Sequence, residues 1–144
     1  MKKQLELQEK YGLFINGEWT MGSEGNTITS ENPANGEILA SFINATNDDV
    51  DAAVLAATHS LKSWRKVSIE ERSKLLLKIA DIIDENIESL AMLETLDNGK
   101  PIRETLNIDI PLGSDHFRYF AGVIRSEEGT AQNLNTDVLS IVLK

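Results

Sequence analysis

The chain has 144 residues, of which 41% are hydrophobic and 26% are charged, a length and composition typical of one globular domain. Its formal net charge of -9 argues against binding to nucleic acid or anionic membranes, because both attract Lys and Arg. The absence of cysteine excludes disulfides, thiolate nucleophiles and sulfur-ligated metals, and no apolar run reaches the roughly 18 to 20 residues that cross a bilayer.

The N-terminal region begins with a polar leader, residues 1–12, for which we expect little fixed structure. Residues 1–10 contain three lysines but lack the apolar centre of a signal peptide, so we expect a cytoplasmic protein. Asn16-Gly17 then lies between apolar residues. This pair predicts a β-hairpin, because a type I′ turn needs positive φ at both central positions.

Two further strands are predicted next along the chain. Residues 27–31 and 38–43 are rich in β-prone side chains. Residues 32–37 separate them and contain Pro, Asn and Gly, which favour a turn. We therefore expect the two strands to pair with each other.

Helices are predicted after Ala45. Thr46 or Asn47 can cap the first helix, which Trp64 closes. Ser68 and Glu71 have the spacing of a capping box for the next helix. Apolar residues then recur at helical spacing between positions 75 and 93, and we expect that face to pack into a core. A break is expected near residue 86.

The end of this helical stretch is marked by Asn98-Gly99, which tolerates the left-handed backbone that ends helices. Pro101 then begins another helical stretch, which Pro111 interrupts. The spacing predicts a new helix with Asp109 near its N-cap and Pro111 in its first turn.

The last predicted element is a strand over residues 137–144, rich in β-branched residues and without an evident partner. The predicted fold class is therefore α/β and rich in helix. An N-terminal hairpin and strands come first, a helical layer follows, and one terminal strand completes the chain.

A search for catalytic groups finds none. The two histidines, His59 and His116, have the settings of surface residues. The acidic pairs that begin at residues 48 and 70 lie in first helical turns, where they offset the helix dipole. No serine lies in a Gly-x-Ser-x-Gly elbow, and no glycine-rich phosphate loop or transition-metal spacing occurs.

Several segments, in order, resemble the NAD(P)-dependent aldehyde dehydrogenases. They are Phe14-Ile15-Asn16-Gly17-Glu18-Trp19, Asn32-Pro33-Ala34-Asn35-Gly36-Glu37-Ile38, Trp64 followed by Glu71-Arg72 and Leu76, Glu94-Thr95-Leu96-Asp97-Asn98-Gly99-Lys100-Pro101, and Asp109-Ile110-Pro111 with Arg118-Tyr119-Phe120-Ala121-Gly122. Each segment alone is a weak signal. Five in sequence at compatible spacing, covering residues 13–144, identify the chain as similar to the N-terminal segment of that family.

The resemblance implies that residues 13–130 belong to a Rossmann-type cofactor domain and residues 131–144 begin an oligomerisation hairpin. It implies an oxidoreductase that uses NAD or NADP to convert an aldehyde to a carboxylic acid. The family's catalytic and cofactor-binding residues lie beyond this segment, so none is assigned here. This chain alone is expected to be inactive, to bind no cofactor, and to need the remainder of a dehydrogenase chain that forms homo-oligomers.

The resemblance also implies one monovalent cation site. Many family members bind such a cation through backbone carbonyls and one aspartate, which would here be the carbonyls of Ser30 and Glu31 with Asp109. Carboxylate and carbonyl oxygens suit a hard cation. The alternative role for Asp109 is the helix cap already described.

A second hypothesis is a stand-alone, non-catalytic interaction module that derives from the same family and self-associates. The residues leave open which aldehyde is used, whether NAD or NADP is the cofactor, and the size of the oligomer.

Overall fold

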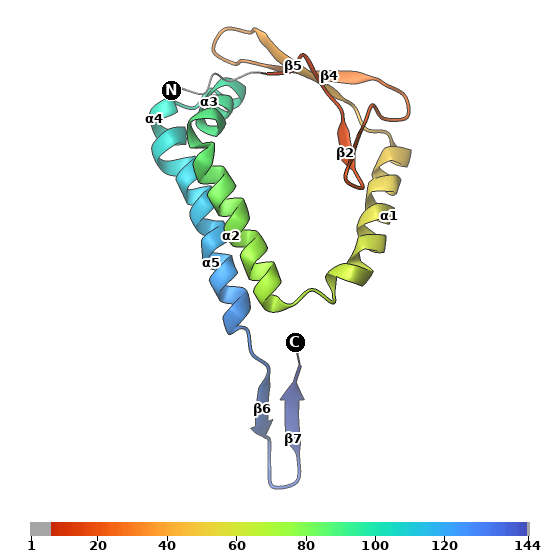
Figure 1. Ribbon diagram of the computed structural model, residues 1–144, viewed down its shortest axis with the longest axis vertical. Coiled ribbons are helices and arrows are strands. Elements are labelled where there is room, and N and C mark those ends of the chain that lie inside the picture. The colour runs from red at the N-terminus through yellow and green to blue at the C-terminus, as the bar shows by residue number, and fades with distance from the viewer. Residues whose placement is uncertain (1–6, 144) are drawn as a thin grey trace.

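The computed structural model describes residues 7–143, and these form a mixed α/β fold that is rich in helix, as predicted (Figure 1). The elements run in the order β1 (Lys10–Tyr11), β2 (Leu13–Ile15), β3 (Glu18–Thr20), β4 (Thr27–Glu31), β5 (Ile38–Ile43), α1 (Asn47–Trp64), α2 (Ile69–Glu85), α3 (Ile87–Asn98), α4 (Ile102–Glu104), the π-helical turn η1 (Thr105–Asp109), α5 (Ile110–Ser126), β6 (Thr130–Asn133) and β7 (Leu139–Val142).

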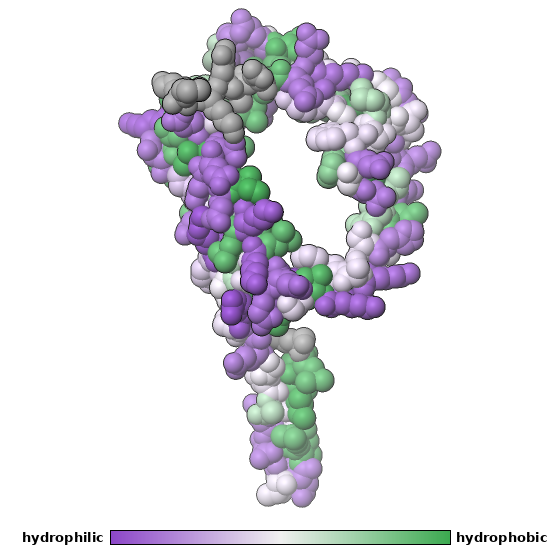
Figure 2. All heavy atoms as spheres, viewed as in Figure 1, coloured by the Kyte–Doolittle hydropathy of each residue, from purple (hydrophilic) through white to green (hydrophobic). Residues whose placement is uncertain are grey.

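The elements form an open frame rather than a filled globule. Helices α2 and α5 lie side by side and run in opposite directions on one side of the frame, and α1 forms the other side. The N-terminal strands connect the two sides, and the β6–β7 hairpin projects away from the frame (Figure 1). Figure 2 shows that side chains leave an opening through the middle of the frame.

The hairpin of β2 and β3 is confirmed, together with its turn chemistry. Asn16 and Gly17 have φ values of 55° and 82°, as a type I′ turn requires. Strands β2 and β3 pair antiparallel, with Ile15 opposite Glu18. The rings of Phe14 and Trp19, one on each strand, lie 5.2 Å apart between centroids.

A three-stranded sheet of order β1-β5-β4 lies beside this hairpin. The antiparallel pairing of β4 with β5 is confirmed. Strand β1 was not predicted: within the polar leader, Lys10 and Tyr11 pair parallel to β5, and the Tyr11 ring stacks on Phe42 at 5.4 Å. The remainder of that leader before residue 7 lies outside the described residues.

Both predicted capping boxes are present. Thr46 and Asp49 cap α1 reciprocally, and Ser68 and Glu71 cap α2 in the same way. The predicted break lies at Asn86, whose φ of -117° separates α2 from α3.

Helix α5 begins at Ile110, with Asp109 at the N-cap position and Pro111 in the first turn, as predicted. Asp109 has helical backbone angles and its side chain makes no cap hydrogen bond. Pro111 has no N–H to donate to the carbonyl four residues earlier. A wider π turn, in which the Ile110 N–H reaches the Thr105 carbonyl, accommodates this loss without ending the helix.

The terminal strand is present as β7, but the expectation that it lacks a partner in this chain is wrong. It pairs antiparallel with β6, which precedes it, with Thr130 opposite Val142 and Asn133 opposite Leu139. Strand β6 escaped prediction because its sequence, Thr-Ala-Gln-Asn, has no alternating apolar pattern. The turn between the strands is held by the Asp137 N–H, which donates to Asn135 Oδ1 at 2.9 Å.

Among the described residues, the buried side chains are few and mostly small. The buried apolar residues are Ala40, Ile43, Ala80, Ala91 and Ala121. The apolar stripe of α2 and α3 is not buried as expected, since Leu75 and Ile82 remain 44% and 48% exposed. The chain exposes 11166 Å², whereas a compact monomer of its mass, 15.9 kDa, exposes about 7,400 Å². Among residues 7–143, α5 packs against α2 and buries Ser73 and Ala80, but these large side chains of the stripe stay uncovered.

Within residues 7–143, no helix combines the length and the apolar character that a membrane crossing requires.

Candidate functional site

A group of polar contacts between distant segments lies where α3 ends. We call this group the α3–α4 corner and define it as residues 97–100 together with Ser30, Pro33 and Asp109. It joins the end of β4, the β4–β5 turn, the exit of α3 and the π turn. The segments come together because α3 stops abruptly at Gly99 and the chain turns back through Pro101.

Gly99 is required at this corner for two reasons. Its φ of 80° is left-handed, which side-chain-bearing residues adopt only at a cost. A Cβ at this position would also lie 2.9 Å from Cγ of Pro33. The α3 exit therefore packs directly on the β4–β5 turn.

The β4–β5 turn holds Pro33 in place through the buried Asn32. The carbonyl of Asn32 accepts hydrogen bonds from the Gly36 N–H at 2.7 Å and from the Asn35 N–H at 3.3 Å. Its side-chain Oδ1 accepts from the Ala34 N–H at 2.9 Å. Asn32 is only 8% exposed. Its burial is tolerated because its oxygens accept hydrogen bonds from backbone N–H groups of the turn.

Lys100 and Asp109 form the ion pair of the corner. The Lys100 ammonium lies 2.5 Å from Asp109 Oδ2, with side chains 37% and 23% exposed. The hydrogen bond to Asp109 raises the pKa of Lys100 above its usual 10.5. The ion pair therefore favours the protonated form of Lys100, which is a positioned cation at neutral pH. Nothing in the sequence indicated this pair, since its members are nine positions apart.

The three residues of the predicted cation site occupy different contacts here. The side chain of Ser30 donates a 2.5 Å hydrogen bond to Asp97 Oδ1, whereas Asp109 faces Lys100. Glu31 ends β4, where the register to β5 shifts. In the described part of the chain, no three His, Cys, Asp or Glu side chains are grouped as they would be around a metal ion. The monovalent cation site remains a prediction.

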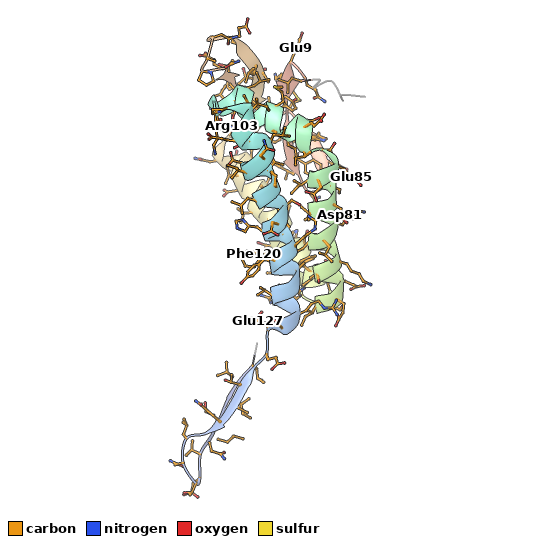
Figure 3. All side chains as sticks on the ribbon, turned by 90° about the vertical axis from the view of Figure 1, so that its left-hand side faces the viewer. Glu9, Asp81, Glu85, Arg103, Phe120 and Glu127 are labelled. Atoms are coloured by element: carbon orange, nitrogen blue, oxygen red, sulfur yellow. The ribbon has the colours of Figure 1, made fainter. Side chains whose placement is uncertain are left out.

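A second polar cluster joins α2 to α5. Arg118 Nη2 lies 2.7 Å from Asp81 and 2.9 Å from Asp84, while its Nη1 donates to Ser114 Oγ. Figure 3 shows the two helices side by side and labels Asp81 on α2. The guanidinium can satisfy several acceptors because it presents five donors in a fixed plane. This cluster fixes the helix pair and offers no reactive group.

The two histidines are exposed on α1 and α5, as expected for surface residues. Asp49 and Glu71 are engaged in capping boxes, which fits the predicted role of the acidic pairs in first turns. The contacts described for the corner and for the α2–α5 cluster are hydrogen bonds, ion pairs and close packing that join distant segments. We read the corner as a structural junction.

Comparison with known proteins places this junction in a family context. Residues 19–144 match the sequence profile described as "Aldehyde dehydrogenase family". An acetaldehyde dehydrogenase of Pseudomonas aeruginosa is 48% identical over 131 residues, and an EPTC-inducible aldehyde dehydrogenase of Rhodococcus erythropolis is 43% identical over 136 residues. These alignments cover 91% and 94% of this chain but only 26% and 27% of the relatives.

Solved structures agree with the sequence relatives. The NAD+ complex of an aldehyde dehydrogenase from Bacillus cereus matches this chain with a TM-score of 0.86 at 37% identity. The match covers 95% of this chain and 30% of that chain. The chain therefore spans between a quarter and a third of the length of these proteins.

Proposed function

Because the chain belongs to the aldehyde dehydrogenase family, we propose that it forms the N-terminal part of the cofactor domain in an NAD(P)-dependent enzyme that oxidises aldehydes to carboxylic acids. Residues 13–130 contribute helices and strands to that domain, and residues 131–144 belong to an oligomerisation hairpin. In the intact enzyme NAD or NADP accepts the hydride, and a cysteine thiolate from the remainder of the chain attacks the aldehyde carbonyl.

The observation that carries this proposal is the uncovered apolar surface of the frame. The fully buried side chains of greatest volume are only Thr105 and Ser114, whereas large residues such as Leu75, Leu77 and Ile82 remain more than 40% exposed. Each large apolar side chain left in water forgoes roughly 1.5 to 3 kcal/mol of burial. The remainder of a dehydrogenase chain, about three times the length of this segment in the relatives, is the packing partner that we propose.

We further propose that residues 1–144 alone catalyse no aldehyde oxidation and bind neither NAD nor NADP. Three observations support this proposal: the sequence has no cysteine, both histidines are exposed, and the pKa of Lys100 is raised.

The test is NADH or NADPH formation by the purified chain with acetaldehyde and either cofactor, with the Pseudomonas aeruginosa relative as the positive control. We expect no turnover above a buffer control. Aldehyde-dependent turnover that persists after repeated purification would contradict the inactivity. In a second experiment, the remaining part of that relative is produced together with the chain, and recovery of activity supports the proposed role as an N-terminal segment.

The alternative function is a non-catalytic module that self-associates, and one observation favours it. The projecting β6–β7 hairpin exposes apolar side chains, with Leu139 and Ile141 58% and 57% exposed (Figure 2). Sedimentation velocity of the purified chain separates the two functions. A single defined oligomer over a range of concentrations favours the module, whereas heterogeneous aggregates favour a segment that lacks its packing partner.

A further inference from the structure

The sequence contains three Asn-Gly pairs, at residues 16–17, 35–36 and 98–99. An asparagine followed by glycine is chemically labile, because the next backbone nitrogen can attack the side-chain amide carbon without hindrance from a Cβ. The reaction needs a side chain that is free to rotate and an N–H that is free to lose its proton. All three pairs lie in turns, but the structure holds them differently.

Asn35 is held at both ends of its amide. Its Oδ1 accepts a hydrogen bond from the Glu37 N–H at 3.0 Å, and its Nδ2 donates to Glu37 Oε2 at 2.7 Å. The nitrogen that would attack is also engaged, since the Gly36 N–H donates to the Asn32 carbonyl at 2.7 Å. These bonds oppose both requirements of the reaction.

Asn98 is held in the same manner. Its Oδ1 accepts from the Lys100 N–H at 2.7 Å, and its Nδ2 donates to Glu94 Oε1 at 3.4 Å. The Gly99 N–H donates to the Thr95 carbonyl at 3.0 Å and so closes the last turn of α3. The helix exit therefore protects this pair.

Asn16 lies at the exposed tip of the β2–β3 hairpin without comparable restraint. Among residues 7–143, no partner hydrogen-bonds its side-chain amide or the Gly17 N–H. The two-residue loop closes through Ile15 and Glu18, which leaves the Gly17 N–H outside the ladder. No atom lies within 4 Å of the position that a Cβ on Gly17 would take, so the tip has space to rearrange.

We propose that Asn16 is the site at which this folded chain preferentially deamidates. The Gly17 nitrogen loses its proton and bonds to Cγ of Asn16, the Cγ–Nδ2 bond breaks, and ammonia leaves a cyclic imide. Water then opens the ring. Cleavage of the bond between Cγ and the Gly17 nitrogen gives aspartate, and cleavage of the main-chain bond gives isoaspartate. No oxidation or reduction takes place.

The modification changes the contact between the hairpin and α1. Phe14, Ile15 and Asn16 line an open hollow of about 230 Å³ with Ala53, Ala56, Ala57 and Ser60 of α1, and Figure 1 shows the hairpin hanging beside that helix. Either product places a carboxylate there, and isoaspartate also adds a methylene to a loop of only two residues. We expect isoaspartate to disrupt the type I′ turn and loosen the hairpin from α1.

Peptide mapping by mass spectrometry tests the proposal, because the chain carries its own controls. The 144-residue chain is incubated at mildly alkaline pH in buffer or in concentrated urea, and conversion is followed at all three pairs. In urea the three rates should converge. In buffer we expect Asn16 to react ten- to hundredfold faster than Asn35 and Asn98, since two or three hydrogen bonds must open at those sites. Equal rates in buffer, or a slower rate at Asn16, would overturn the proposal.

A single variant tests whether hydrogen bonds are the cause. Glu37→Ala removes the acceptor of the Asn35 amide and leaves the Asn35-Gly36 sequence intact. We expect the rate at Asn35 to rise several-fold towards that of Asn16, with Asn98 unchanged. An unchanged rate at Asn35 in a chain with wild-type circular dichroism would remove the physical basis of the proposal.

Discussion

The Ser73 hydroxyl donates a 2.8 Å hydrogen bond to the Ala121 carbonyl in the buried seam between α2 and α5. Two turns away the arrangement is reversed, since Ser114 of α5 donates to the Ala80 carbonyl of α2 at 3.2 Å. On each helix the serine and the alanine are seven residues apart and therefore share one face. Thr105 makes a third such bond, to the Ala91 carbonyl at 3.0 Å. Small side chains let these helices approach closely. Each buried hydroxyl then donates its hydrogen bond to a backbone carbonyl of the facing helix.

The seam between α2 and α5 should tolerate the loss of a hydroxyl group better than the introduction of a larger side chain. Ser73→Ala removes one hydrogen bond and should lower the free energy of unfolding by about 1 kcal/mol. Ala80→Leu places a large side chain at a position that is 0% exposed, and overpacking of this kind costs about 1 to 3 kcal/mol. Urea denaturation of both variants, followed by circular dichroism, checks the order. A more stable Ala80→Leu variant would contradict close packing at this seam.

Gly99 at the end of α3 and Gly122 within α5 should respond to alanine in opposite directions. Gly99→Ala introduces a Cβ at φ 80° and only 2.9 Å from Pro33, so we expect a loss of at least about 1 kcal/mol. Gly122 lies within α5 with no atom near its missing Cβ, so Gly122→Ala should stabilise the helix by roughly 0.5 to 1 kcal/mol. Thermal unfolding of both variants measures the contrast. Equal shifts of the midpoint would show that the α3 exit does not depend on the left-handed conformation.

The local elements were predictable because their signals are local. Asn16-Gly17, the Thr46 and Ser68 caps and the Gly99 exit each act within a few residues, and each was found where the sequence indicated. Strands β1 and β6 were missed because each is short and polar, and pairing rather than propensity creates them. The π turn was missed because a chain can accommodate the missing N–H of Pro111 in two ways. It can begin a new capped helix, or it can widen one turn of a continuous helix.

The candidate site was less predictable than the fold. Ser30 and Asp97 are 67 positions apart, and only the folded structure brings the end of β4 to the end of α3. Lys100 and Asp109 meet because the π turn redirects Asp109 towards the α3 exit. Burial was also misjudged, because a periodic apolar stripe indicates a face that needs covering without indicating that this chain covers it.

Acid should weaken the connection between the loop after β3 and the start of α1. Asp49 accepts hydrogen bonds from the Thr46 N–H at 2.9 Å and the Ser23 N–H at 3.0 Å. The Thr46 bond is the main cause that lowers the pKa of Asp49 below its ordinary 3.8. Because the folded-state pKa is depressed, the stabilisation is present above pH 3.8 and is lost as the pH falls through the lower folded value.

Thermal unfolding across this acidic range, with two matched variants, checks the effect. Asp49→Asn should reduce the decrease of the midpoint with falling pH. Asp48→Asn removes the same charge from the same helical turn but leaves Ser23 and Thr46 untouched, so it should retain the wild-type pH dependence. Identical pH profiles in the two variants would assign the effect to the helix dipole alone.

The Lys100–Asp109 pair determines whether the predicted monovalent cation site can form. A cation bound by Asp109 and the carbonyls of Ser30 and Glu31 must compete with an ammonium at 2.5 Å. Lys100→Met removes that competitor and leaves the Asp109 carboxylate partly buried without its counter-charge. We therefore expect Lys100→Met to be less stable than wild type in N-methylglucamine chloride, and to recover part of that loss in NaCl or KCl at the same ionic strength.

The comparison separates a bound ion from general screening, because the two salts screen equally and differ only in whether the cation fits between oxygen ligands. Asp109→Asn in the Lys100→Met background supplies the control, since it removes the charge that would hold the ion. Loss of the salt-specific recovery in that double variant supports the site. If the Lys100→Met midpoint is the same in both salts, these three residues hold no monovalent cation in this chain, and the role of Asp109 is to fix Lys100 at the end of α3.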